Sequence, residues 1–218
     1  MKKNNKRYKN LSIVALILGI ICLTIGFAAF SSTLIIYSNA NVSPNKNTLN
    51  VNFSSSETKI TTDDIIPIKS PSTITATNAT INNSGDPTIT GLSAVFTEPG
   101  QSATYTFYAR NDGRYAAFLK NIVYENVSGE ASPRICIAGE NSNDSLVQAA
   151  CDDIILSIKV GDENEVTGSK ISITNHVLEK NTAEKITVKI EYKANGDEAD
   201  GPFSVKFGDV ILIYSSID

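Results

Sequence analysis

Histidine and the motifs of common enzyme sites are scarce in this sequence. It has one histidine, His176, and no GxSxG, HExxH or glycine-rich phosphate-binding segment. A Ser-His-Asp arrangement would have to use that histidine, and we predict instead that it is a solvent-facing residue at a strand end or turn. A zinc site would also lack ligands, because there is only this one histidine and no pair of cysteines with the spacing of zinc ligands. We therefore predict no catalytic residues, no metal site and no cofactor, in a protein that is not an enzyme.

Paired acids are the remaining candidates for calcium binding or acid–base chemistry. They occur at Asp63-Asp64 and Asp152-Asp153, and the segment DEADG at 197–201 has a superficial likeness to a calcium loop. Adjacent side chains on a strand point to opposite faces, so such pairs rarely converge. The DEADG segment also lacks the acid spacing and distal Glu of an EF-hand. We interpret these acids as solvated edges and a hairpin tip.

Basic residues are few beyond the N-terminus. Of the 19 Lys and Arg, five lie in the first nine residues, whereas the 23 Asp and Glu all follow residue 28. Without residues 1–28 the chain keeps 14 basic side chains and a net charge of −9. Nucleic-acid binding needs Lys and Arg to replace counterions, and docking on anionic lipid also needs positive charge. The acidic balance argues against both partners.

The N-terminus has the pattern of an export signal. A basic start precedes an uncharged, apolar run from Leu11 to Phe27, and Gly26-Phe27-Ala28 fits the small-x-small cleavage pattern. We predict a signal peptide over 1–28, cleavage between Ala28 and Ala29, and a secreted, extracellular or cell-surface protein. The alternative is an uncleaved membrane anchor, because the uncharged stretch 11–30 is long enough to span a bilayer.

Cysteine is also scarce, with three residues, of which Cys22 lies in the predicted signal. Cys136 and Cys151 remain as an even pair in an oxidising compartment, so we predict a disulfide between them. Closing a loop of about 15 residues should stabilise the fold by about 3 kcal/mol if chain entropy dominates. The alternative is two buried free thiols.

Alternation of apolar and polar residues, which is typical of strands with one buried face, recurs after residue 48. It is clearest in KITVKIEYK, at Ile186, Val188, Ile190 and Tyr192. The segments TLNVNFSS and SATYTFYAR show it too, at Leu49, Val51 and Phe53 and at Ala103, Tyr105, Phe107 and Ala109. From Ser54 to Thr88 the chain is rich in Ser, Thr, Asn and Pro, and we predict short edge strands and loops there.

The last strand and its neighbours give further expectations. FSVKFGDVILIYSS is apolar on both faces from Val210 to Tyr214, so we predict a bend at Gly208 and then a central strand covered on both sides. Turns are predicted at Pro99-Gly100, Asn111-Gly113 and 195–201. One short helix is predicted in NDSLVQAAC, capped by Asn143 or Asp144, with Leu146, Val147 and Ala150 on its apolar side.

These patterns predict an all-β protein with one domain over 48–218, a two-sheet antiparallel sandwich. A separate strand is predicted over 30–42, within an N-terminal strand and hinge region at 29–47. Its intervening positions are mostly polar, which a membrane helix would not show. Its alternate positions are all apolar or small: Phe30, Ser32, Leu34, Ile36, Ser38, Ala40 and Val42.

Three segments resemble the TasA/camelysin family of exported Gram-positive proteins. They are FAAFSS, NVNFSSSE and EPGQSATYTFYARNDGRYAAFLKNIVYEN, with matches at Ala29-Phe30, Pro99-Gly100 and Asn111-Asp112-Gly113. The similarity is strongest over 26–56 and 95–126. It implies a jelly-roll-like sandwich, release by a dedicated signal peptidase and self-association into biofilm-matrix fibres.

In fibres of that family the mature N-terminal strand of one subunit completes the sheet of the next. The resemblance thus implies an assembly strand formed by Phe30, Leu34, Ile36, Ala40 and Val42, with other matrix or surface proteins as further partners. Some members are described as metalloproteases, but this sequence has no recognisable zinc ligands.

Three functions stay open at the level of sequence. The first is an extracellular fibre subunit, and the second is a membrane-tethered, monomeric surface sandwich that binds a protein or glycan ligand. The third is a secreted hydrolase, which chelator-sensitive cleavage of casein would reveal. The N-terminus separates the first two, because a free strand can be donated and a tethered one largely cannot.

Overall fold

The computed structural model describes residues 49–140, 142–168 and 170–216, which belong to one compact unit, Pro44–Asp218. For residues 170–175 we describe the backbone only. The predicted signal peptide, its cleavage site, the assembly strand and the hinge lie outside the described residues. In the part of the chain that the structure describes, no helix combines the length and apolar character that a membrane crossing requires.

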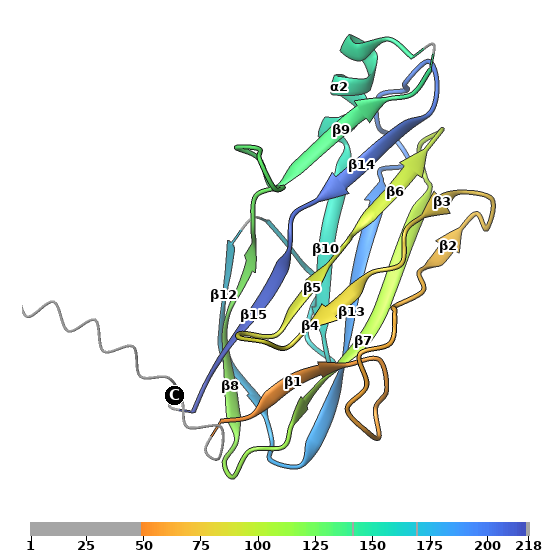
Figure 1. Ribbon diagram of the computed structural model, residues 1–218. Helices are drawn as coiled ribbons and strands as arrows, with labels where there is room; N and C mark the ends of the chain where they lie inside the picture. Colours follow the sequence, from red (N-terminus) through yellow and green to blue (C-terminus); the bar gives the residue numbers. More distant parts are fainter. Residues whose placement is uncertain (1–48, 141, 169, 217–218) are drawn as a thin grey trace, which may run out of the picture. The chain divides into compact units, whose positions relative to one another are not determined.

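Antiparallel strands make up most of the unit, in two layers (Figure 1). One layer, sheet 1, has the order β1–β7–β13–β10–β11, and β2 also pairs with β7. The bounds are β1 (Val51–Ser54), β2 (Ile68–Ser70), β7 (Ser102–Asn111), β10 (Ile154–Val160), β11 (Val166–Thr167) and β13 (Thr182–Tyr192).

The other layer consists of two sheets that continue one another. Sheet 2 has the order β12–β8–β15–β5–β4 and sheet 3 the order β9–β14–β6–β3. The chain passes directly from β5 to β6 and from β14 to β15 across two-residue breaks, so the two sheets form one bent surface. The bounds are β3 (Thr75–Ala76), β4 (Thr80–Asn82), β5 (Thr88–Thr90), β6 (Ser93–Phe96), β8 (Ala117–Tyr124), β9 (Arg134–Ala138), β12 (Lys170–Leu178), β14 (Phe203–Phe207) and β15 (Val210–Ser215).

The connectivity is that of a jelly roll. In chain order the strand units are β5/β6, β7, β8/β9, β10, β11, β12, β13 and β14/β15. The first pairs with the last, β7 with β13, β8 with β12, and β10 with β11. Such nested pairing is a long hairpin rolled into two sheets. The predicted all-β, two-sheet antiparallel sandwich is confirmed, with β1 to β4 as additions to its edges.

The hydrophobic core lies between the two layers and contains residues that the alternating sequence pattern predicted to be buried. The predicted inward residues of β7 and β13 are all fully buried. Aromatic rings meet edge to face across the core: the centroids of Phe53 and Phe107 are 4.8 Å apart, and those of Tyr192 and Phe203 are 5.6 Å apart. Such pairs add to the stabilisation that burial alone provides.

The C-terminal strand pair agrees with its prediction in part. The chain breaks at Gly208, between β14 and β15, where the bend was expected. β15 is central, between β8 and β5, as predicted. The predicted cover on both faces is wrong, because Ile211 and Ile213 are only half-buried. The sandwich has two layers, so the outer face of even a central strand borders solvent.

The predicted turns are confirmed. Gly100 has φ of 88° between β6 and β7, a conformation that favours glycine. Asn111 ends β7, and its side chain organises the next turn: Nδ2 donates to the carbonyls of Tyr115 (2.9 Å) and Leu178 (3.0 Å), while Oδ1 accepts from the Gly113 amide. The segment between Ser54 and Thr88 holds short strands, β2 to β4, as expected.

Candidate functional site

The predicted disulfide between Cys136 and Cys151 is present, with Cα atoms 6.0 Å apart. It joins β9 to the helix α2 (Asp144–Asp152), which leads into β10. Asn143 caps this helix, because its side chain accepts a hydrogen bond from the Ser145 amide at 2.9 Å. Val147 and Ala150 face the core as predicted. The prediction for Leu146 is wrong, since that side chain is 43% exposed.

His176 is not the solvent-facing residue that the sequence predicted. It lies within β12, and its side chain is only 10% exposed. Its Nε2 is 2.6 Å from Oε2 of Glu184 on β13, and its Nδ1 is 3.2 Å from Oε1 of Glu163. The hydroxyl of Tyr214, on β15, donates to Glu184 at 3.1 Å. This histidine cluster, His176, Glu184, Glu163 and Tyr214, links sheet 2 to sheet 1.

The charges of the histidine cluster support one another. Burial by itself lowers the pKa of His176, but the carboxylates of Glu184 and Glu163 outweigh it and raise that pKa. Burial raises the pKa of Glu184, and His176 opposes the rise. Tyr214 remains a neutral donor because burial raises its pKa well above the usual value. The contacts of the cluster join β12 and β15 to β13, so we interpret it as a structural link.

The acid pair at Asp152-Asp153 ends the helix and is compensated by cations. Asp153 accepts from Lys193 Nζ at 2.9 Å and from the Asp197 amide at 2.8 Å. The hydrogen bond from Lys193 contributes most to lowering the pKa of Asp153. Asp152 lies 3.5 Å from the Arg134 guanidinium. Across the described ranges, no group of three or more His, Cys, Asp or Glu could hold a metal ion.

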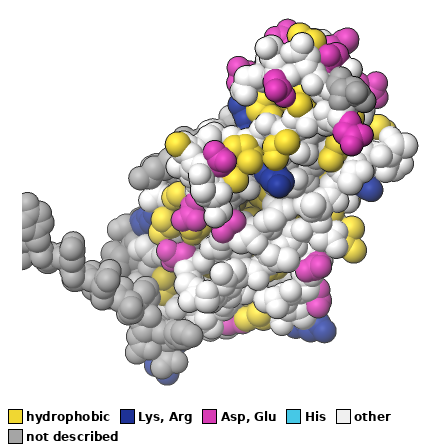
Figure 2. Space-filling model, turned by 45° about the horizontal axis from the view of Figure 1, so that its top comes forward, with side chains coloured by type: hydrophobic (Ala, Val, Ile, Leu, Met, Phe, Trp, Pro, Cys, Tyr) yellow, Lys and Arg dark blue, Asp and Glu magenta, His cyan; other side chains and the backbone are white. Residues whose placement is uncertain are grey.

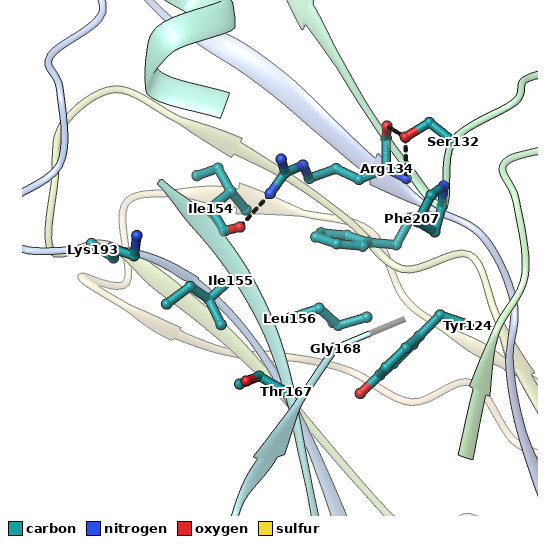
Figure 3. Close-up of a pocket in the computed structure, with 11 residues that line it drawn as sticks. Tyr124, Ser132, Arg134, Ile154, Ile155, Leu156, Thr167, Gly168, Lys193 and Phe207 are labelled. Atoms are coloured by element: carbon teal, nitrogen blue, oxygen red, sulfur yellow. Dashed lines mark hydrogen bonds between the residues drawn. The ribbon is translucent and has the colours of Figure 1, made fainter. Parts of the chain in front are cut away.

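A cleft of about 360 Å³ opens between the two layers at the side where β10 faces β9, and we call it the lateral cleft. Leu156 of β10 lines it from sheet 1, whereas Tyr124 and Phe207 line it from the other layer. Figure 3 shows these side chains around one space, with Arg134 above them. Its remaining lining residues are Ser132, Pro133, Ile154, Ile155, Thr167, Gly168 and Lys193.

Beside the lateral cleft the edge of sheet 1 is bare. Within the described residues, β11 pairs with Ser157 and Ile158 of β10 alone, and the next strand, β12, belongs to the other layer. In the described residues, Ile154–Leu156 therefore have a strand partner on one side, β13, and none on the other. The Arg134 side chain donates to the Ile154 carbonyl at 2.5 Å and occupies one acceptor of this edge. An uncovered edge of this kind is a site for strand addition.

Some polar groups of the lateral cleft have hydrogen-bond or ion-pair partners, and one has none in the part of the chain that the structure describes. Arg134 and Lys193 are both engaged, with Asp152 and Asp153. Tyr124 is 8% exposed, and its hydroxyl is buried without a hydrogen-bond partner within the described residues. Desolvation raises the pKa of Tyr124, which keeps the hydroxyl a donor. A buried hydroxyl without a partner is uncommon in folded proteins and calls for an explanation.

A second, more polar groove of about 670 Å³ lies at the bend between sheets 2 and 3. Its hydrogen-bonding residues include Asn78, Asn126, Glu125 and Asp209. Burial raises the pKa of Asp209. The face in Figure 2 carries scattered acidic side chains and a few isolated cations, without a broad basic patch on that face.

The structure places only part of the predicted site. Cys136 and Cys151 come together as expected, whereas the cleavage site Ala28/Ala29 and the assembly residues lie outside the described residues. The lateral cleft was missed because its residues come from strands far apart in the sequence, and none belongs to a recognisable motif. The one sequence feature that points to the cleft is the apolar run Ile154–Leu156, which directly follows the acid pair Asp152-Asp153. No family model, curated protein or solved structure matches this chain.

Proposed function

We propose that this chain is an extracellular structural subunit that assembles into surface or biofilm-matrix fibres by donating its N-terminal strand, residues 30–42. The observation that supports this most directly is that the described residues, from 49 onward, form a two-layer sandwich around one buried cluster. The unit has its own core, and the alternating segment 30–42 precedes it in the chain. The resemblance to the TasA/camelysin family favours the same function.

The physical reason for assembly is the apolar face of that segment. After cleavage at Ala28, a strand that presents Leu34 and Ile36 needs both a hydrophobic surface and backbone partners. Addition to the sheet of a neighbour supplies both, and it is a head-to-tail contact. A head-to-tail contact that does not close into a ring produces a filament. The partners in this proposal are further copies of the chain, a signal peptidase and other matrix proteins, and no enzymatic activity is part of it.

The test compares two purified fragments. Residues 29–218 are expected to form fibres or concentration-dependent oligomers, and residues 43–218 are expected to stay monomeric, by sedimentation and negative-stain microscopy. Leu34→Asp or Ile36→Asp should weaken assembly, because each places an unpaired charge against an apolar surface. Thr33→Asp, on the polar face, is the matched control. Monomeric behaviour of 29–218 at high concentration across pH would reject the proposal, as would equal assembly of 43–218.

The polar groove at the bend between sheets 2 and 3 favours a second candidate, a tethered surface domain that binds a glycan. Side-chain amides and carboxylates such as those of Asn78, Asn126 and Asp209 suit the hydroxyl groups of sugars. This function requires an uncleaved N-terminus. Mass spectrometry of the protein released by its native host distinguishes the two candidates, because strand donation needs a chain that begins at Ala29.

A further inference from the structure

We propose that the bare β10 edge at Ile154–Leu156, together with the lateral cleft, is the place where a subunit receives the strand 30–42 of a second copy. The proposal rests on the proposed function and identifies the receiving side of the same contact. It joins three observations on the described residues: an edge without a partner strand, an apolar cleft next to it, and a buried hydroxyl that lacks a hydrogen-bond partner.

The edge supplies the backbone contacts. A strand laid beside Ile154–Leu156 continues sheet 1 in line with β11, which covers only the next two residues of β10. The Ile154 carbonyl, which Arg134 holds, would exchange a side-chain donor for a backbone donor. Exchanging one hydrogen bond for another makes the edge available at small cost, while the arginine protects it in the free subunit.

The cleft supplies the apolar contacts. Ile154 and Leu156 both point inward from β10, so an added strand would direct its own alternate side chains into the cleft opposite Tyr124 and Phe207. Tyr124 lines the same space (Figure 3), and its hydroxyl is buried, so the neighbouring side chains have to shift on entry of the strand before a strand carbonyl can accept its hydrogen bond. The site therefore suits an extended peptide better than a charged small molecule, because its cations are already paired.

The segment 30–42 matches this site in charge and in size. It has no charged residue. On its apolar face the large side chains Leu34 and Ile36 are neighbours, with the small Ser32 and Ser38 on either side. Alternate residues on a strand are roughly 6.6 Å apart, which is also the spacing of the inward residues Ile154 and Leu156 on β10. The short bare edge thus has room for one such pair of side chains.

The proposal takes the donor strand from a second copy. Val51 begins β1 beside Asn111, at the end of sheet 1 opposite to Ile154, which pairs with Tyr192. β11 occupies the edge of β10 at Ser157 and Ile158, on the side of Ile154–Leu156 that faces this far end. A strand from a neighbour reaches Ile154–Leu156 beside α2, which the disulfide holds to β9 at the start of β10 (Figure 1). The contact is accordingly between copies, as a filament requires.

Photo-crosslinking in the mature chain, residues 29–218, maps the contact directly. A benzoylphenylalanine placed at Leu34 is expected to give intermolecular adducts whose tryptic peptides contain Ile154–Leu156 or Tyr124. The same probe at Thr33 faces away and should give at least fivefold less of these adducts. Adducts from Leu34 that map to another edge, such as β2 or β12, would overturn the proposal and leave the fibre function intact.

Two substitutions in the receiving site provide a second test that does not depend on the probe. Leu156→Trp fills the cleft and should raise the concentration needed for assembly at least tenfold, whereas Ile211→Trp, on the half-buried outer face of β15, should not. Tyr124→Phe removes only the hydroxyl and should weaken assembly about threefold to tenfold. The melting temperature of 29–218 at a concentration below assembly should not fall with Tyr124→Phe, because that hydroxyl has no partner in the free subunit.

The outcomes separate the two proposals. Normal fibres from Leu156→Trp and Tyr124→Phe proteins that remain folded by circular dichroism would reject the β10 edge as the receiving site, while strand donation would stand. Failure of unmodified 29–218 to assemble would reject the fibre function itself. If Leu156→Trp does not fold, the adduct map and the Tyr124→Phe result decide the question.

Discussion

His176 and Glu184 form a short contact between the two layers of the sandwich, with 2.6 Å from Nε2 to Oε2. The histidine comes from β12 in sheet 2 and the glutamate from β13 in sheet 1. Both side chains are nearly buried, at 10% and 12% exposure. The pair ties an edge strand to the central strand of the opposite sheet, so we expect its charge state to affect the stability of the whole sandwich.

The first prediction is that stability falls as the pH rises through the titration of His176. The pKa of His176 is raised in the folded state, so protonated His176 stabilises the fold. This stabilisation is fully present below the unfolded pKa of about 6.5, and it is lost as the pH rises through the folded pKa. The raised pKa of Glu184 also makes stability fall as the pH rises, but over a lower pH range. Urea unfolding between pH 6 and 9 should show this decrease, and the His176→Gln protein should show a smaller one. Identical pH profiles would contradict the assignment.

The second prediction concerns removal of one partner of that pair. His176→Ala leaves Glu184 buried without a cation, and it should lower the free energy of unfolding by about 3 kcal/mol at neutral pH. Because burial already raises the pKa of Glu184, the loss should shrink in acid, where the carboxyl becomes neutral. Unfolding at pH 7 and pH 4.5 measures both values. Lys180→Ala, at an exposed position on the neighbouring turn, is the control and should change little.

The third prediction is that reduction of the Cys136–Cys151 bond lowers the free energy of unfolding by about 3 kcal/mol, because it closes a loop of 15 residues. Urea titrations with and without reductant measure this difference. The double variant Cys136→Ala/Cys151→Ala should give the same value under both conditions. Intact mass after alkylation gives an independent check, and two alkylated thiols in natively secreted protein would be incompatible with the prediction.

The fourth prediction is that Gly208 tolerates no side chain. A Cβ there would lie 2.0 Å from the carbonyl oxygen of Glu125, and the next nearest atoms are also backbone, of Glu125 and Asn126, so no side-chain movement can relieve the overlap. Gly208→Ala should therefore cost about 2 to 3 kcal/mol, measured by chemical unfolding. Gly85→Ala is the matched control, because a Cβ at that position meets no atom within 4 Å. Equal effects of the two substitutions would show that the bend is not tightly packed.

The fifth prediction concerns the buried Asn111. Asn111→Ala removes both donors to the carbonyls of Tyr115 and Leu178 and the acceptor for the Gly113 amide, so three backbone groups lose a partner. We expect a loss of about 2 to 3 kcal/mol in the free energy of unfolding. Asn82→Ala, which affects an exposed side chain bonded to Ser84, should cost below about 1 kcal/mol. A comparable effect at both sites would contradict the role of Asn111 as a turn anchor.

Local pattern in the sequence was enough to predict the fold class and much of the core. A strand with one buried face must alternate, so Tyr105, Phe107, Ile186 and Val188 could be assigned inward without knowledge of their neighbours. Gly208 and the Pro99-Gly100 turn were identified for the same reason, since backbone geometry depends on the residues themselves. An even pair of cysteines likewise sufficed to predict the disulfide.

The tertiary structure decided the features that depend on contacts between distant strands. The sequence suggested a turn position for His176, but β13 brings Glu184 to it from the other layer, and Tyr214 of β15 donates a hydrogen bond to that glutamate. The lateral cleft is lined by β10 on one side and by residues of β8, β9 and β14 on the other, an arrangement of distant segments that no local pattern records. Burial and pairing at such positions follow from strand order, and strand order is set by the packing of the whole chain.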